Sequence, residues 1–222
     1  QAVPLLCGSA GLHEKNWVSF ADGDRLRYVY QLSAQLVITQ EAWGQCLRDE
    51  QYLDFSRNAA TEALEELRAV KGMQLHGSAS ALDWGEDGST RLALFHTKDE
   101  KKAYVTLAYL FDAAPPYRVL NVSRPLPLAG GNASFASSLT YAPGGTKVVV
   151  AYGLADAEAR ALVMSREYLA SLFDWWAYCE AEKDGGALPP SAPPVQAASL
   201  YAFGGNGGDS DAWGGLEVSQ DC

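Results

Sequence analysis

Apolar and polar residues alternate along most of the chain, in short runs that end at Gly, Pro, Asp or Asn. A period of two residues is typical of β-strands with one buried face. Tight turns are predicted at residues 21–24, 85–88 and 143–145. The predicted strands cover residues 17–20, 26–32, 36–38, 81–84, 91–96, 104–111, 117–122, 135–141, 147–152 and 159–164. The pattern therefore predicts an all-β fold built from consecutive hairpins.

Two segments have a helical period instead. Between Asn58 and Val70, apolar residues recur every three or four positions, and Asn58 and Thr61 are candidate caps. A second short helix is predicted over residues 165–173, because Ser165 can cap its start and Glu167 falls in the first turn.

The last part of the chain differs in composition. Residues 180–222 are rich in Pro, Gly, Ala and Ser, a composition that buries too little apolar surface to offset the loss of backbone entropy. The sequence thus predicts an ordered domain over residues 1–179 and a flexible tail over residues 180–222.

Successive short hairpins with few helices fit two architectures, a β-sandwich and a β-propeller. Uneven hairpin lengths favour propeller blades. About 180 ordered residues would make only three to four blades at roughly 40 to 60 residues each, whereas a closed propeller of this type needs about five. The propeller interpretation predicts that the N-terminal part of the propeller is missing, and an intact small β-sandwich stays open as the alternative.

Composition and charge exclude some classes of function. The 48% of hydrophobic residues argue against disorder, and the net charge of −10 disfavours nucleic acid and anionic membrane surfaces as partners. No run approaches the roughly 18 consecutive apolar residues of a membrane-spanning helix, so a soluble chain is expected.

Neither a metal nor a cofactor is predicted. The cysteines are far apart and form no C-x-x-C pair, and the histidines form no recognisable ligand set with them: Cys7, Cys46, Cys179, Cys222, His13, His76 and His96. Two glycosylation acceptor patterns, at Asn121 and Asn132, matter only if the chain enters the secretory route to the Golgi, and the compartment is left open.

Three short motifs, each beside a predicted strand, carry the candidate chemistry: Glu14-Lys15-Asn16-Trp17, Phe95-His96-Thr97 and Tyr152-Gly153-Leu154-Ala155-Asp156. Their spacing suggests polar groups that successive sheets deliver to one shared site. Lys15 and His96 are donors suited to phosphate or to sugar hydroxyls, and Trp17 is a candidate platform for a sugar ring. The alternatives are a solvated Lys15 and His96, a core role for the aromatic residues, and an Asp156 that caps a turn.

Four segments resemble five-bladed propeller proteins that act on carbohydrates. His13 to Val18 with the strand up to Tyr30 is similar to the E-K-N/D-W segment of mannoside phosphorylases and hydrolases, and of propeller domains beside glycosyltransferases. Three further matches follow in the family's order over about residues 11 to 173: 77–80 with 92–96, 109–112 with 116–120, and 149–153 with Asp156.

This resemblance implies a glycan or sugar phosphate as ligand, bound by Glu14, Lys15, Asn16, Trp17, His96, Tyr152 and Asp156. The family's catalytic carboxylate precedes the E-K-N/D segment, where this chain has thirteen residues, and Ala79 and Ser80 replace the family's prolines. The expected function is therefore glycan binding, or a part of a larger glycosidase, phosphorylase or glycosyltransferase-linked polypeptide that is inactive alone. A non-catalytic protein-interaction propeller is the alternative, and burial of the motifs between sheets would favour it.

Overall fold

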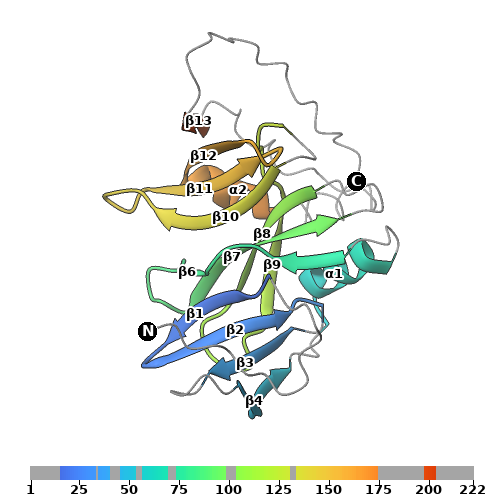
Figure 1. The fold of residues 1–222 in the computed structure, drawn as a ribbon. Helices are drawn as coiled ribbons and strands as arrows, with labels where there is room; N and C mark the ends of the chain where they lie inside the picture. Colours follow the sequence, from blue (N-terminus) through green and yellow to red (C-terminus); the bar gives the residue numbers. More distant parts are fainter. Residues whose placement is uncertain are drawn as a thin grey trace, which may run out of the picture.

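The computed structural model describes residues 16–33, 35–40, 46–53, 57–69, 74–98, 104–130, 134–174 and 198–203. In these residues three antiparallel sheets follow one another along the chain and lie face to face (Figure 1). We call them the first, central and third sheets. The prediction of a mostly β fold with few helices is confirmed. None of the helices in this part of the chain is long and apolar enough to cross a membrane.

The first sheet contains β1 (Val18–Asp22), β2 (Arg25–Gln31), β3 (Leu36–Gln40) and β4 (Cys46–Leu53), paired in chain order. Alternation explains the first three strands, because Val18, Val29 and Val37 pair across them and are all buried. β4 was not predicted. Its sequence, CLRDEQYL, lacks alternation because it carries a run of polar residues.

The central sheet contains β5 (Gln74–Gly77), β6 (Leu82–Asp83), β7 (Thr90–Lys98), β8 (Tyr104–Asp112) and β9 (Val119–Pro125). β5 and β6 both pair with β7, at its two ends, and so form one interrupted first strand. The predicted turn at residues 85–88 joins this strand to β7, with Gly88 at a φ of 68°.

The third sheet contains β10 (Ser134–Tyr141), β11 (Lys147–Leu154), β12 (Glu158–Ser165) and β13 (Ala198–Phe203). β13 belongs to the segment for which a flexible tail was expected, yet it pairs with β12 over six residues. Its sequence, ASLYAF, is mostly apolar, and the average composition of residues 180–222 concealed it. The rest of that segment lies outside the described residues.

Both predicted helices are confirmed. α1 (Ala59–Ala69) begins after Asn58, whose Oδ1 accepts a hydrogen bond from the Thr61 amide at 2.9 Å. α2 (Arg166–Ser171) begins after Ser165, which caps the Tyr168 amide at 3.0 Å, and continues into the 3-10 turn η2 (Leu172–Asp174).

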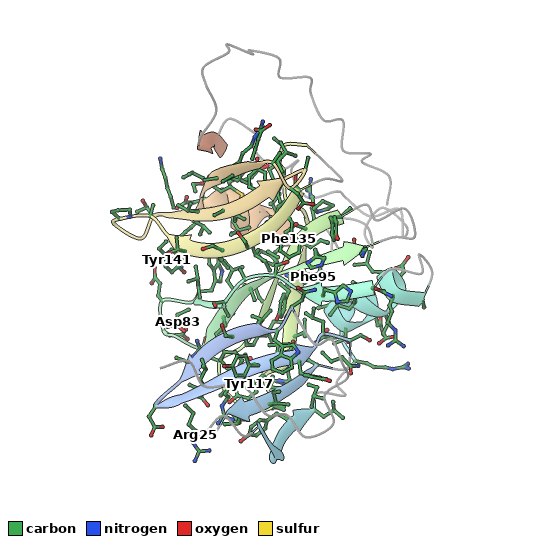
Figure 2. The ribbon with its side chains drawn as sticks, viewed as in Figure 1. Arg25, Asp83, Phe95, Tyr117, Phe135 and Tyr141 are labelled. Carbon is green, nitrogen blue, oxygen red and sulfur yellow. The ribbon has the colours of Figure 1, made fainter. Side chains whose placement is uncertain are left out.

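The central sheet is buried on both faces. Leu92 and Leu94 pack into a core shared with the third sheet and α2, while Ala93 and Phe95 pack into a core shared with the first sheet and α1. Figure 2 shows Phe135 on the side of the third sheet and Tyr117 on the side of the first. Each fully buried Leu or Phe contributes roughly 1.5–3 kcal/mol, so these two cores hold the three sheets together.

The first strands of the three sheets run side by side in the same direction. The Ala81 amide of the central sheet donates to the Ser19 carbonyl of β1 at 2.8 Å, and Gly77 lies against Asn16 and Val18. On the other side the Tyr141 hydroxyl at the end of β10 donates to the Asp83 carbonyl. A succession of four-stranded sheets whose first strands lie together is the arrangement of propeller blades.

Candidate functional site

The candidate residues share one end of the structure. We call the end at which β1, β5 and β10 begin the starting end. Because strands alternate in direction, the last residues of β7 and the turn between β11 and β12 also lie there. Asn16, Trp17, His96, Tyr152 and Asp156 therefore all lie at or near the starting end, whereas Glu14 and Lys15 lie outside the described residues.

Trp17 belongs to an aromatic cluster on the first sheet. Its ring centroid lies 5.7 Å from that of Tyr28 and 5.4 Å from that of Tyr30. Tyr30 is 37% exposed, and burial raises the pKa of the Tyr28 phenol. We call Trp17, Tyr28 and Tyr30 the aromatic cluster. Its partly exposed rings are of the kind that stack on the apolar face of a sugar.

His96 is buried rather than exposed at its strand end, with only 1% of its surface accessible. Its Nδ1 shares a hydrogen bond of 2.9 Å with Ser78 Oγ. The ring centroid lies 5.4 Å from both His76 and Tyr104, and 5.0 Å from Phe135 of the third sheet. We call these four ring residues the histidine cluster. The cluster joins the central sheet to the third sheet. Because almost none of the His96 surface is accessible, this side chain does not offer a contact surface to a ligand.

Tyr152 and Asp156 lie close in sequence but in different surroundings. Tyr152 is 2% exposed in the core between the central and third sheets, and burial raises the pKa of its phenol. Asp156 is exposed in the turn after β11, where it and Ala155 have φ values of 55° and 52°. Asp tolerates this left-handed conformation better than most residues, so the turn-forming interpretation of Asp156 agrees with the structure.

The starting end therefore gathers the candidate residues without lining one cleft with them. Asn16 and Trp17 are partly buried, His96 and Tyr152 are buried, and Asp156 is exposed. Among the described residues, no group of three or more His, Cys, Asp or Glu side chains could hold a metal ion.

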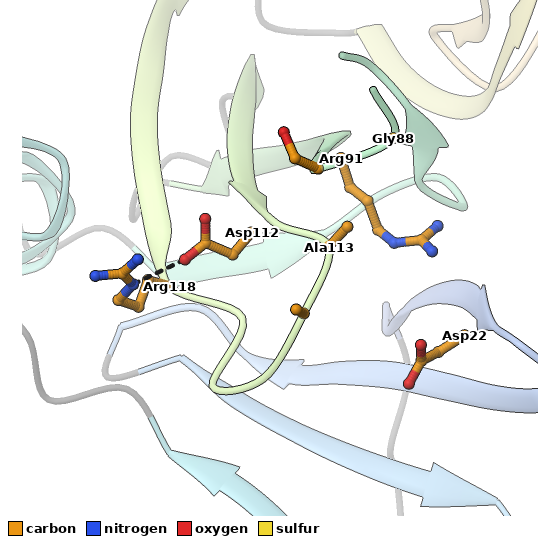
Figure 3. Close-up of a pocket in the computed structure, with 8 residues that line it drawn as sticks. Asp22, Gly88, Arg91, Asp112, Ala113 and Arg118 are labelled. Carbon is orange, nitrogen blue, oxygen red and sulfur yellow. Dashed lines mark hydrogen bonds and ion pairs between the residues drawn. The ribbon is translucent and has the colours of Figure 1, made fainter. Parts of the chain in front are cut away.

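Sequence reasoning missed a polar hollow at the opposite end, between the first and central sheets (Figure 3). Its volume is about 530 Å³, and it is open to solvent. It is lined by Asp22, Gly88, Ser89, Arg91, Asp112, Ala113, Ala114 and Arg118, which we call the Asp22 hollow. The available signal was that Asp22 and Gly88 each lie at a predicted turn and that Asp112 follows the predicted strand 104–111; antiparallel pairing brings these strand ends together.

Asp22, in the wall of the hollow, forms an ion pair with the buried Arg27. The Arg27 Nε donates to Asp22 Oδ2 at 2.6 Å, and the Tyr117 hydroxyl donates to the same oxygen at 2.8 Å. The Arg27 guanidinium also lies over the rings of Tyr52 and Tyr117, at 5.1 and 5.6 Å. Burial alone would raise the pKa of Asp22, but the bonds from Arg27 and Tyr117 and the charges of Arg27 and Arg91 lower it. Asp22 is thus held as a carboxylate.

Comparison with known proteins bears on the fold. No protein-family model matches the sequence, and no curated protein matches it. Among solved structures, the chain is similar to a β-1,2-mannobiose phosphorylase from Listeria innocua in complex with β-1,2-mannobiose, with a TM-score of 0.52 and 16% identity. The match covers 74% of this chain and 48% of that one, so the chain spans about half the length of that enzyme. The fold of this chain is propeller-like.

Proposed function

We propose that this chain is a glycan-binding domain of the five-bladed propeller type, with its sugar site at the starting end. The observation that carries the proposal is the aromatic cluster: Trp17 of the E-K-N-W motif packs with Tyr28 and the partly exposed Tyr30 at that end. The likeness of the fold to a mannobiose phosphorylase supports a carbohydrate as the ligand.

Each motif has a separate part in this proposal. The aromatic cluster supplies the apolar face for a sugar ring, and Asp156, on the third sheet, supplies an exposed carboxylate for hydroxyls of another unit of the same glycan. Glu14 and Lys15, next to Asn16 in the sequence, add a carboxylate and an ammonium, the latter suited to a sugar phosphate. His96 and Tyr152 are positioning residues that fix the central and third sheets beneath the site.

The test is calorimetry or ligand-observed NMR on the full chain with β-1,2-mannobiose, methyl mannosides, methyl glucosides and inorganic phosphate. Tyr30→Ala and Leu26→Ala are matched variants, because the two side chains lie on the same strand and are 37% and 42% exposed. Asp156→Asn is matched by Asp24→Asn, an exposed residue in the β1–β2 turn at the opposite end.

Saturable binding of a glycoside should weaken about fivefold or more with Tyr30→Ala and Asp156→Asn, since a stacked aromatic ring and a hydrogen bond to a charged group each contribute about that factor. Leu26→Ala and Asp24→Asn should leave it unchanged. A folded chain that binds none of these compounds would refute the proposal.

A second candidate is a protein-interaction propeller without a glycan site. The burial of His96 and Tyr152 between sheets favours it, because these residues then only join neighbouring blades. It predicts that no glycoside of the panel binds and that Tyr30→Ala and Leu26→Ala behave alike in every binding assay.

A further inference from the structure

The Asp22 hollow has a balanced set of charges. Its lining includes the carboxylates of Asp22 and Asp112 and the guanidinium groups of Arg91 and Arg118. In Figure 3, Asp112 and Arg118 lie on one side of the loop at Ala113, and Arg91 and Asp22 lie on the other. An anion would meet two carboxylates here and a cation two guanidinium groups, so the charges favour a ligand without net charge.

The backbone of the hollow is already engaged within the protein. The Ser89 amide donates to Asp87 Oδ1 at 2.9 Å, the Ala113 amide to the Ser89 carbonyl at 2.8 Å, and the Gly88 amide to the Gly85 carbonyl at 3.2 Å. A phosphate cradle is built from several backbone amides directed at the anion. These amides do not form one, which argues further against an anionic ligand.

The side chains retain capacity for hydroxyl groups. Asp22 uses Oδ2 for its bonds from both Arg27 and Tyr117 and is 31% exposed. Arg91 binds Asp83 Oδ1 through Nη1 at 2.9 Å, and its guanidinium group carries further N–H donors. A hydroxyl group both donates and accepts, so it can pair with a carboxylate and a guanidinium at once.

Small apolar groups complete the lining, namely the side chains of Ala113 and Ala114. Behind the lining, the buried Phe20 ring lies 5.1 Å from the Arg91 guanidinium and supports it. The volume of about 530 Å³ is in the range of small-molecule sites. We propose that the Asp22 hollow is a second binding site, for the ring of a neutral sugar, separate from the starting end. This site does not depend on the one proposed at the starting end.

The test is a titration of the full ¹⁵N-labelled chain, followed by amide chemical shifts, with methyl α-D-mannopyranoside, methyl β-D-glucopyranoside, inorganic phosphate and glycine as probes. The amides of Gly88, Ser89, Ala113 and Ala114 report on the Asp22 hollow, and those of Trp17, Tyr30 and Asp156 report on the starting end. We expect saturable shifts of the first set with a glycoside, at millimolar affinity because the hollow is open. The proposal would be overturned if phosphate or glycine changed the chemical shifts of these amides and neither glycoside did. It would also be overturned if none of the four probes changed them.

Two variants assign the binding to the hollow. Arg118→Gln breaks the ion pair with Asp112, and Arg160→Gln is its control, since Arg160 forms an ion pair of the same 2.7 Å length with Glu158 at the starting end. Ala114→Phe fills the hollow from an exposed position. Arg118→Gln and Ala114→Phe should each weaken the binding about fivefold or more, and Arg160→Gln should not.

Thermal unfolding of each variant checks that it is folded. If Arg118→Gln does not fold, the result with Ala114→Phe alone decides whether the glycoside binds in the hollow. Glycoside binding that persists in a folded Ala114→Phe chain refutes the site. Because the two ends have separate reporting amides, failure of either site is visible without reference to the other.

Discussion

The Nδ1 atom of His96 and the Oγ atom of Ser78 lie 2.9 Å apart, in a hydrogen bond between β7 and the segment that joins β5 to β6. The bond fixes the imidazole against Phe135 of the third sheet, with centroids 5.0 Å apart. His96 therefore holds the central and third sheets together at this junction.

His96→Ala should lower the free energy of unfolding by about 2–4 kcal/mol, because it leaves a cavity beneath the partly buried rings that pack on His96 and removes a partner of Ser78. His76→Ala, in the same cluster but partly exposed, should cost only about 1 kcal/mol. Urea denaturation of both variants measures the difference. Equal losses would mean that the histidine cluster does not join the sheets in the way described.

Two buried tyrosines differ in their hydroxyl groups: that of Tyr117 forms a hydrogen bond, and that of Tyr109 has no partner among the described residues. Tyr117→Phe removes the hydrogen bond to Asp22 and should destabilise the chain by about 1 kcal/mol. Tyr109 is fully buried, and its hydroxyl has no hydrogen-bond partner among the described residues. Tyr109→Phe should therefore be neutral or stabilise by up to about 1 kcal/mol, since it removes a buried unpaired polar group. Thermal unfolding of the two variants side by side tests the contrast in sign.

The ion pair of Asp22 makes part of the stability depend on pH. The pKa of Asp22 is lower in the folded chain than its ordinary value of 3.8. The unfolded chain therefore binds the proton more readily, so the contribution of Asp22 is complete above the ordinary pKa and is lost as the pH falls through the folded one.

The difference in unfolding free energy between the unaltered chain and Asp22→Asn should be constant from about pH 5 upwards and shrink between about pH 4 and 2. Denaturation at a series of pH values measures it, with Asp24→Asn as an exposed control. A difference that stayed constant down to pH 2 would contradict the role given to Arg27 and Tyr117.

The contact between β1 and β5 allows no side chain at residue 77. A Cβ at Gly77 would lie 2.7 Å from Val18 Cγ2 and closer still to the Asn16 carbonyl oxygen. Gly77→Ala should destabilise the chain by about 1–3 kcal/mol, because β5 must move away from β1 to make room for the added methyl group. Gly153→Ala is the control, since a Cβ there meets nothing nearer than 4.0 Å. If both substitutions are tolerated alike in thermal unfolding, the strands are not as closely packed as described.

Local pattern was sufficient for most elements. β1 to β3 and both capped helices follow from periodicity, because one face of each is buried against a neighbouring element. β7 is buried on both faces, so its apolar run and the turn before it indicated the strand, whereas the short β5 was not predicted. β4 was missed because its polar run conceals any alternation, and β13 because composition was averaged over a long segment.

The site was less accessible to prediction. The sequence predicted one shared site for the motifs. Strand direction alone places their described residues at or near one end of the structure, but they do not line one cleft there. It did not indicate that His96 is buried, because that depends on Phe135, 39 positions further along the chain, packing onto the ring from another sheet. The Asp22 hollow likewise arises only where turns from two sheets meet.

β7 belongs to both hydrophobic cores, through Leu92 and Leu94 on one face and Ala93 and Phe95 on the other. Neither outer sheet can separate without exposing one face of this strand, and a shift of its register by one residue would exchange the residues of the two cores. β8 is shared in the same way, with Ala108 in one core and Tyr109 in the other. The three sheets are thus thermodynamically coupled through the central sheet, and such coupling makes them melt as one cooperative unit rather than as three independent ones.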